Sequence, residues 1–525
     1  MDTKSSILKN IMKQKEIFIV IVCLALGFSL RFYTFDKKSL WMDEIHTYND
    51  SRDNLKGHLR FYKENPTFLH PPLFFVLTHL FYPFPKPERD LRIIPLIFGT
   101  LSVPMIYFLS RLFCPGIALP CTLSLTFMTY HISLSQDGRS YALILFLGMV
   151  ALYFLMMHLN TSKRTYLFLV AATYALLFHT SYASIPFIVL SQILWFYGVH
   201  HEAQKPRPSS FLILNGLTLL FCMPWILFIM LNYKGESLMH PFHIEGTGSF
   251  LTILYLILHD WAPHVPLMIS SIMLLVLFPF FSNNKKNALI LLALSILPVG
   301  GLYLFCKILN LTHFVSSRYF INFLPSFLIA LYLSLHSIEA KFEKVRKLMR
   351  LKVIFVALFI ASNLSILPLY YRFEKQDLKG LVDYLKVNLR EGDRIFDGAM
   401  GYMPGILHYF GAHPKGRHHA FSFRKGTEKE VKVEIPFIYK NKIYTLNWSN
   451  VCCDQYVADG GRLWIVVGED IAKKFMEDHS FVFKGYFDGS FLNFKKFPSD
   501  ASIYLFLYDP RSPEEKGIDW PIERR

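Results

Sequence analysis

The chain has 525 residues, of which 53% are hydrophobic, 16% are aromatic and only 18% are charged. Its mean hydropathy of +0.32 is too high for a water-soluble protein of this length, so the composition indicates a membrane protein. The net charge of +16 does not indicate nucleic-acid binding, because Lys and Arg occur in short runs between apolar stretches and form no continuous basic face.

The N-terminal segment carries Lys4, Lys9, Lys13 and Lys15 before an apolar run over residues 17–35. This run is long enough to cross a bilayer, has no small-residue cleavage site and is followed by many more apolar runs. We therefore predict a first membrane helix that is retained in the mature protein.

Apolar stretches of about twenty residues predict about eleven membrane spans. They cover residues 17–35, 91–112, 116–134, 139–157, 165–181, 183–199, 210–231, 265–282, 288–306, 319–337 and 352–371. Cytoplasmic loops are rich in Lys and Arg. With the N-terminus inside, the basic loop residues all fall on the inner side: Lys163, Arg164, Lys205, Arg207, Lys285, Lys286, Lys341, Lys344, Arg346, Lys347, Arg350 and Lys352. The segments predicted outside are 36–90, 136–139, 232–264, 307–318 and everything after Tyr371.

Two further apolar stretches are predicted to lie flat at the membrane surface. Residues 70–85 are apolar but short for a crossing, and a crossing there would put the loop at 36–69 and the turn at 135–139 on opposite faces. We expect an interfacial helix with Pro71 at its first position, and a similar helix over residues 249–260.

The composition after Tyr371 is that of a soluble domain of about 150 residues. Helical patterns cover 374–389, 403–410 and 470–478, and strand-like patterns cover 393–396, 463–467 and 502–507. This alternation predicts a small extracytoplasmic α/β domain over residues 372–525, which follows a membrane domain over residues 1–371.

Two adjacent carboxylates, Asp43 and Glu44, follow the first predicted span by a few residues. They allow two interpretations. They are either solvated charges after the interfacial aromatic residue Trp41, or a functional pair. In a functional pair, one carboxylate is the general base for an acceptor hydroxyl and the other orients it or binds a metal.

Two arginines lie at the predicted outer ends of spans. Arg139 follows Asp137 in the segment QDGRSY, and Arg318 lies in SSRYF just before the span at 319–337. Each arginine is either an interfacial anchor or a phosphate ligand, for which a forked and permanently charged side chain is well suited.

The sequence contains no P-loop, no dinucleotide-binding glycine motif, no HExxH and no nucleophile elbow. The polar residues His179, Ser181 and Tyr182 in FHTSY are explained by hydrogen bonding at a helix end. Five of the seven cysteines fall in apolar stretches as small hydrophobes: Cys23, Cys114, Cys121, Cys222 and Cys306. The adjacent Cys452 and Cys453 match no zinc spacing, and we assign them no role.

Four segments, taken in order, resemble one known family. They are LWMDEIHTY at 40–48, HPPLFFVLTHLF at 70–81, QDGRSYALILFL at 136–147 and SSRYFINFLPS at 316–326. They are similar to the dolichyl-phosphate-mannose-dependent protein mannosyltransferase superfamily. This superfamily consists of integral-membrane glycosyltransferases of the C-type fold and includes the bacterial aminoarabinose transferases of the cell envelope. The resemblance extends from the first helix to about residue 370.

The resemblance implies an inverting transfer from a polyprenyl-phosphate sugar to an envelope acceptor, which is a lipid, a glycan or a protein. It implies Asp43 as the base with Glu44 beside it, Asp137 as a second acidic residue and Arg139 near the lipid phosphate. His70 matches the histidine of the family's HPP element. Many relatives read THY where this chain reads FHTSY, so His179 is displaced. The donor- or substrate-binding residues expected in all are His70, Arg139, Tyr141, Arg318 and Tyr319.

Two questions stay open at this point. One is whether a divalent metal ion takes part, held by Asp43, Glu44 and Asp137. The other is whether the chain is instead a lipid or glycan transporter, such as a flippase. Transporters tend to place ionisable residues at mid-membrane and to show repeats, whereas the acids here lie at helix ends. An envelope polysaccharide polymerase would favour long outer loops over a terminal α/β domain. The resemblance to envelope transferases implies the bacterial plasma membrane, with the site and the C-terminal domain outside the cytoplasm.

Overall fold

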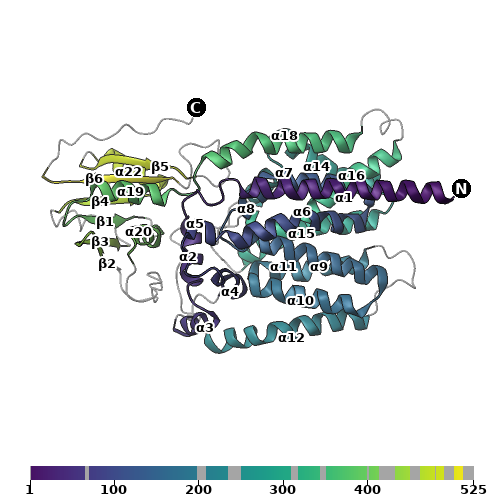
Figure 1. The fold of residues 1–525 in the computed structure, drawn as a ribbon, viewed down its shortest axis with the longest axis horizontal. Helices are drawn as coiled ribbons and strands as arrows, with labels where there is room; N and C mark the ends of the chain where they lie inside the picture. Colours follow the sequence, from purple (N-terminus) through teal and green to yellow (C-terminus); the bar gives the residue numbers. More distant parts are fainter. Residues whose placement is uncertain are drawn as a thin grey trace.

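The fold is described from a computed structural model of the chain. The residues described are 2–64, 70–197, 208–233, 250–308, 317–342, 350–398, 401–412, 432–449, 461–478, 480–489 and 502–511. They form a helical bundle with a mixed sheet at one end, and the N-terminus lies at the opposite end of the bundle (Figure 1). Short helices, α2 to α5, lie between the bundle and the sheet (Figure 1).

The helical part contains long apolar helices together with several short helices. Its α-helices are α1 (Asp2–Phe32), α2 (Met42–Asp50), α3 (Leu55–Glu64), α4 (Leu73–His79), α5 (Pro87–Asp90), α6 (Ile93–Phe113), α7 (Ala118–Phe127), α8 (Thr129–Ser135), α9 (Tyr141–Thr161), α10 (Arg164–Thr180), α11 (Ile185–Leu190), α12 (Pro208–Asn232), α13 (Phe250–Trp261), α14 (Val265–Phe281), α15 (Lys285–Ile308), α16 (Leu324–Lys341) and α18 (Leu351–Arg372). Its 3-10 helices are η1 (Pro115–Ile117), η2 (Tyr182–Ser184), η3 (Ser191–Phe196) and η5 (Ser317–Phe323).

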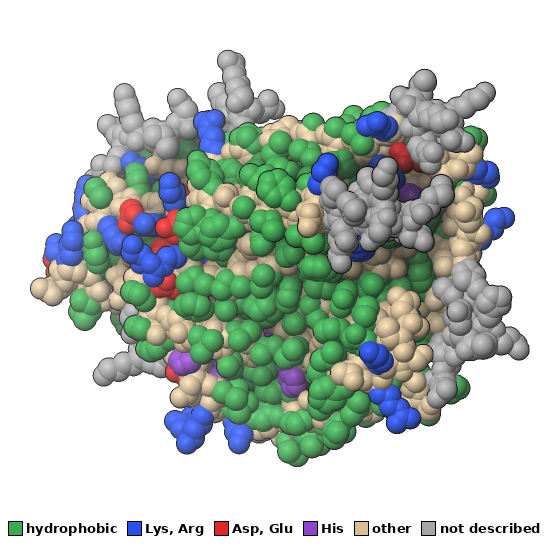
Figure 2. Space-filling model, turned by 45° about the vertical axis from the view of Figure 1, so that its right-hand side comes forward, with side chains coloured by type: hydrophobic (Ala, Val, Ile, Leu, Met, Phe, Trp, Pro, Cys, Tyr) green, Lys and Arg blue, Asp and Glu red, His purple; other side chains and the backbone are tan. Residues whose placement is uncertain are grey.

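Each predicted span coincides with helical structure. Among the described residues, five helices are long and apolar enough to cross a membrane, or up to seven if each of two bent pairs is one span. The segment Tyr182–Phe196 is a shorter apolar helix. The total of about eleven spans therefore stays a prediction, while a polytopic helical membrane protein is confirmed. Figure 2 agrees with this, because hydrophobic side chains cover most of the middle of the visible face and charged side chains gather toward its ends.

One predicted span is broken between α7 and α8, which differ in direction by 60°. A break leaves backbone groups unpaired, and two side chains satisfy them here. The buried Arg31 of α1 donates to the carbonyl oxygens of Leu125 and Thr126 at 2.9 and 3.2 Å. Asn363 of α18 accepts from the Thr129 backbone N–H at 2.9 Å. The bend therefore depends on residues far away in sequence.

The two stretches expected at the membrane surface both contain separate short helices. Helix α4 has only 7 residues, too few to cross a bilayer, and it begins at Leu73 after the N-cap Pro72, so placing Pro71 at its first position is wrong. Helix α13 is bent by 107° relative to α14. If α14 crosses the membrane, α13 therefore lies close to the membrane plane.

The C-terminal domain is built on a six-stranded mixed sheet. Its elements are α19 (Leu378–Asn388), β1 (Arg394–Asp397), α20 (Met403–Phe410), β2 (Lys432–Tyr439), β3 (Lys442–Ser449), β4 (Leu463–Val467), α22 (Glu469–Glu477), β5 (Val482–Phe487) and β6 (Ile503–Tyr508). The strand order is β2-β3-β1-β4-β6-β5, in which β1 is parallel to both β3 and β4 and the other pairs are antiparallel.

Both faces of this sheet are covered. In β4, Trp464 and Val466 pack with α19 and α20, whereas Ile465 and Val467 pack with α22 on the other face. The predicted α/β domain is thus confirmed as a layered sheet domain. The predicted helix over 374–389 begins later, at Leu378, where Asp377 is the N-cap and its side chain accepts from the Gly380 backbone N–H at 2.7 Å.

Some features discussed from the sequence lie outside the described residues, namely Cys452, Cys453, Lys205, Arg207, Lys344, Arg346 and Lys347. Of the cysteines in apolar stretches, Cys23, Cys121 and Cys222 are buried, as expected for small hydrophobes.

Candidate active site

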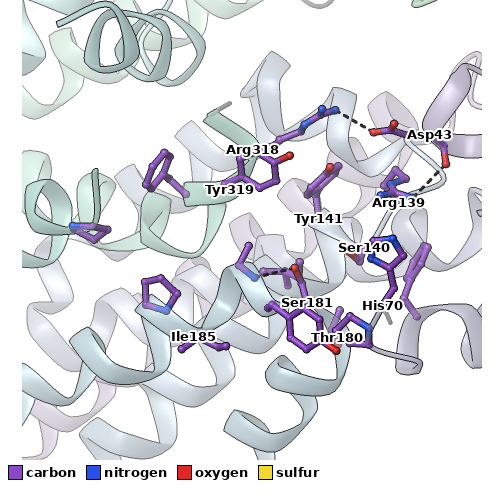
Figure 3. A pocket seen from close by; sticks show the side chains of 18 of the residues that line it. Asp43, His70, Arg139, Ser140, Tyr141, Thr180, Ser181, Ile185, Arg318 and Tyr319 are labelled. Carbon is purple, nitrogen blue, oxygen red and sulfur yellow. Dashed lines mark hydrogen bonds and ion pairs between the residues drawn. The ribbon is translucent and has the colours of Figure 1, made fainter. Parts of the chain in front are cut away.

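A cavity of about 1010 Å³ opens where the short helices α2 and α4 meet the ends of α9, α10 and η5. Six of the eight residues singled out from the sequence line this cavity: Asp43, His70, Arg139, Tyr141, Arg318 and Tyr319. They come from the helices α2, α9 and η5 and from the connections that hold His70 and Arg139, and Figure 3 shows them around one space with Asp43 and the two arginines at one end. The structure thus brings together residues that are up to 276 positions apart, from Asp43 to Tyr319.

Asp43 lies in the first turn of α2 and lines the cavity, and its side chain is 20% exposed. Its Oδ2 is 3.4 Å from Arg318 Nη1. Burial raises the pKa of Asp43, but this effect is outweighed by nearby Arg139 and Arg318, so the net pKa lies below its ordinary value. Asp43 is therefore ionised at neutral pH and able to accept a proton.

The two arginines hold different parts of the α2 segment. Arg139 Nη1 donates to the Asp43 carbonyl oxygen and to Thr47 Oγ1, both at 3.2 Å. The Arg318 guanidinium contacts the Asp43 carboxylate, and it lies over the rings of Trp41 and Tyr141 at 5.3 and 5.7 Å. Both cations line the cavity beside the same carboxylate, so this end of the cavity can bind an anion.

Glu44 does not line the cavity, although it neighbours Asp43 in sequence. Its carboxylate is 1% exposed and accepts from Arg92 Nε at 2.7 Å and from Arg92 Nη2 at 2.6 Å. It also accepts from the backbone N–H groups of Gly138 at 2.6 Å and Trp41 at 3.3 Å. This carboxylate therefore holds the α2 segment against the turn at 136–140.

Arg92 was not identified from the sequence, although it organises the first loop. Besides Glu44, it donates to three backbone carbonyl oxygens, those of Phe35 at 2.9 Å, Lys38 at 3.0 Å and Ser39 at 3.0 Å. A buried charge is tolerated only when it is paired and fully hydrogen-bonded. The Arg92–Glu44 pair meets this condition and fixes the chain between the first helix and α2.

Asp137 is also buried and lies away from the cavity. Its Oδ1 accepts from Trp41 Nε1 at 2.8 Å, and its Oδ2 accepts from Lys375 Nζ at 2.7 Å. Both carboxylate oxygens are therefore engaged by this chain's own side chains, and Asp137 holds Trp41 and Lys375 in place.

The FHTSY turn contributes to the cavity through Thr180, Ser181 and Tyr182. His179 does not line it, and its Nε2 lies 3.3 Å from the Phe221 carbonyl oxygen. Ser181 Oγ accepts from the Ala183 backbone N–H and caps η2, as expected for a polar residue at a helix end.

Two polar residues of the cavity were missed by the sequence analysis, His46 and Asp50. Residues 36–69 were treated as a loop, whereas residues 42–50 form α2. Positions i, i+3 and i+7 share one face of a helix, so Asp43, His46 and Asp50 face the cavity together. Burial lowers the pKa of His46, which keeps its imidazole neutral at neutral pH.

The rest of the cavity is mostly apolar, apart from polar residues such as Tyr62 and Thr180. Its walls include Ile144 of α9, Ile185 and Val189 of α11, and Phe320 and Phe323 of η5. The combination of charged groups at one end and hydrocarbon side chains along the rest suits a ligand with an anionic head and an apolar chain.

The carboxylates considered for a metal ion do not form a ligand set. Among the described residues, no group of three or more His, Cys, Asp and Glu side chains could hold a metal ion. Glu44 and Asp137 already accept from Arg92 and Lys375, so the three carboxylates do not fit one shared ion. Dependence on a divalent metal stays an untested expectation.

Comparisons with known proteins identify the class of fold to which this chain belongs. No protein-family model matches this sequence, and no curated protein matches it. Among solved structures, the chain is similar to ArnT from Cupriavidus metallidurans in the apo state, with a TM-score of 0.53 and 11% identity over 94% of this chain and 98% of that chain. The same ArnT bound to undecaprenyl phosphate aligns with a TM-score of 0.49 and 12% identity over 94% and 98% of the two chains. The arabinofuranosyltransferase AftD from Mycobacteria aligns with a TM-score of 0.44 and 14% identity over 72% of this chain and 29% of that chain.

The similarity to ArnT at this level of identity shows a shared fold that extends over nearly the whole chain. The protein therefore has the C-type glycosyltransferase fold, which the four sequence segments implied. Its apolar helices and this fold make it an integral membrane protein.

Proposed function

We propose that this protein is a membrane glycosyltransferase that moves a sugar from a polyprenyl-phosphate donor to an acceptor hydroxyl at the membrane surface. The observation that carries the proposal is one cavity that has Asp43, Arg139 and Arg318 at one end and mostly apolar walls along the rest. Its charged end suits a sugar phosphate, and its apolar part suits a hydrocarbon chain. The shared fold with ArnT supports the same class of reaction.

The chemistry follows from the charges at that end. The acceptor oxygen attacks the anomeric carbon of the donor, its proton passes to the Asp43 carboxylate, and the bond between the anomeric carbon and the phosphate oxygen breaks. The leaving polyprenyl phosphate keeps the electron pair, and Arg139 and Arg318 stabilise the negative charge that develops on it. Attack from the face opposite the phosphate inverts the anomeric configuration.

The decisive experiment is a donor screen with the purified, detergent-solubilised protein. Polyprenyl-phosphate sugars with different labelled sugars are incubated with membrane lipids and glycans as acceptors, with and without a chelator of divalent ions. We expect one donor to be consumed, with release of polyprenyl phosphate and label in an acceptor. If no donor is consumed and the protein in vesicles moves labelled polyprenyl phosphate between leaflets, the chain is a transporter.

We further propose that the cavity and the sheet domain lie outside the cytoplasm. The N-terminus and the sheet lie at opposite ends of the bundle, and Lys163, Arg164, Lys285 and Lys286 belong to segments that the positive-inside rule places in the cytoplasm. A reporter enzyme that is active only after export should be active when fused to the C-terminus of the full chain and inactive at its N-terminus. Activity of a cytoplasm-dependent reporter at the C-terminus would place the site on the inner side.

A further inference from the structure

The segment just before Asp43 is held by the C-terminal domain. Three of its backbone N–H groups donate to side chains of that domain: Ser39 N to Glu374 Oε2 at 3.0 Å, Leu40 N to the Tyr409 hydroxyl at 2.7 Å and Met42 N to Gln376 Oε1 at 3.0 Å. The N–H group of the intervening residue, Trp41, donates to Glu44 within the same segment. Every backbone N–H from residue 39 to residue 42 is therefore directed to a fixed acceptor.

Lys375 connects this segment to the turn that carries the phosphate-binding arginine. Its Nζ lies 2.7 Å from Asp137 Oδ2 and 3.6 Å from the centre of the Trp41 ring. Trp41 Nε1 in turn donates to Asp137 Oδ1 at 2.8 Å. One lysine side chain thus contacts residues that stand two positions before Asp43 and two positions before Arg139.

The hydrogen bonds that Asp137 accepts are strong because its side chain is shielded from water. The Asp137 side chain is 2% exposed and the Lys375 side chain is 25% exposed. A charge-assisted hydrogen bond in a buried setting is short and directional, and removal of one partner leaves the other charge uncompensated. The Lys375–Asp137 pair therefore holds the turn with Asp137 at a fixed distance from the segment with Trp41.

Apolar contacts reinforce the same junction. Leu40, Ile45, Phe84 and Leu91 form a buried cluster on which Tyr409 of α20 packs. The Tyr48 ring of α2 meets the His408 ring of α20 edge to face at 4.6 Å between centroids. Helix α2 thus packs against α20 through Ile45 and Tyr48, and Figure 1 shows α2 beside the sheet domain.

We propose that Glu374, Lys375, Gln376 and Tyr409 form a loop clamp, through which the C-terminal domain sets the position of the Asp43 carboxylate relative to Arg139. Lys375 is the central positioning residue of this clamp. The inference rests on the proposed role of Asp43 as base. It gives the C-terminal domain a part in the transfer step, although none of its described residues lines the cavity.

The test compares Lys375→Met with Lys375→Arg in the full-length protein. Loss of the charge should lower kcat about 10–100-fold with the KM for the donor changed by less than about threefold, because a misplaced base slows transfer without removing donor contacts. Lys375→Arg keeps the charge and should recover most of kcat. Lys386→Met is the matched control, because Lys386 is exposed to a similar extent but its partner at 3.2 Å on the same domain, Asp383, has a side chain that is 55% exposed. This variant should leave kcat unchanged.

Hydrogen exchange of the backbone amides provides a second readout that does not need activity. In Lys375→Met, the amides of residues 39–44 should exchange faster while those of strands β1 and β4 stay protected. Tyr409→Phe removes one hydroxyl without changing a charge, and it should speed exchange of the Leu40 amide. This variant tests the clamp if Lys375→Met fails to fold. Unchanged exchange at 39–44 in a folded variant would overturn the clamp. If the wild-type protein transfers no sugar, the proposed function fails and exchange alone decides the clamp.

Discussion

Replacement of Asp43 by Asn should abolish sugar transfer, with kcat lower by about 10²–10⁴-fold, the usual contribution of a general base. Asparagine is close in size to aspartate but cannot take the acceptor proton. The Arg139 bond to residue 43 uses the backbone carbonyl oxygen and is kept, and Arg318 loses only its carboxylate partner. Donor binding should therefore be retained, and single-turnover rates and donor affinity measure the two quantities separately.

The matched control for this experiment is Asp36→Asn, since Asp36 is an exposed carboxylate on the same loop. It should leave the turnover unchanged. In the wild type, the pKa of Asp43 lies below its ordinary value, so the rate should be flat near neutral pH and fall only as acid protonates the carboxylate. Near-normal turnover of Asp43→Asn, or an equal loss in Asp36→Asn, would remove Asp43 from the role of base.

Replacement of Glu44 by Gln should destabilise the protein by about 3–5 kcal/mol, because it leaves the buried Arg92 guanidinium without its counter-charge. The pair is tightly engaged, with 2.6 Å between Arg92 Nη2 and Glu44 Oε2 and exposed fractions of 4% and 1% for the two side chains. The measurement is the free energy of unfolding of the purified protein in detergent.

The chain offers a matched control for burial. Glu16 and Arg111 form a pair at the same distance of 2.6 Å, but their side chains are 28% and 37% exposed. Because solvent screens such a pair, Glu16→Gln should cost at most about 1 kcal/mol. If Glu44→Gln lowers the free energy of unfolding equally little, Glu44 is not a structural anchor. If it lowers turnover without lowering stability, Glu44 has a catalytic role.

Local patterns were sufficient for the membrane helices and for half of the sheet. The predicted ranges agree to within about one residue with strands β1, β4 and β6 and with helices α20 and α22. Each of these elements carries a local apolar pattern that can be recognised without knowing its neighbours in space. Strands β2, β3 and β5 were not predicted. The turn between β2 and β3 uses positive φ angles at Lys440 and Asn441 without a glycine, and β2 contains Pro436, which is tolerated because β2 is an edge strand.

The four motif segments contain all six predicted residues that line the cavity, but they could not separate the roles of Asp43 and Glu44. Adjacent residues on an α-helix point about 100° apart, so only one of the two can face the cavity. Which one does depends on where α2 packs, and this is decided by Arg92, a residue 48 positions further along the chain.

The sequence by itself determined the membrane class and the presence of a C-terminal sheet domain, because hydrophobic period and composition are local properties. Only the tertiary structure decided which carboxylate reaches the cavity and that the C-terminal domain holds the loop beside it. Those outcomes depend on contacts such as Lys375 with Asp137, which join residues 238 positions apart. No local pattern encodes such a contact, since it forms only after the bundle and the sheet domain have packed together.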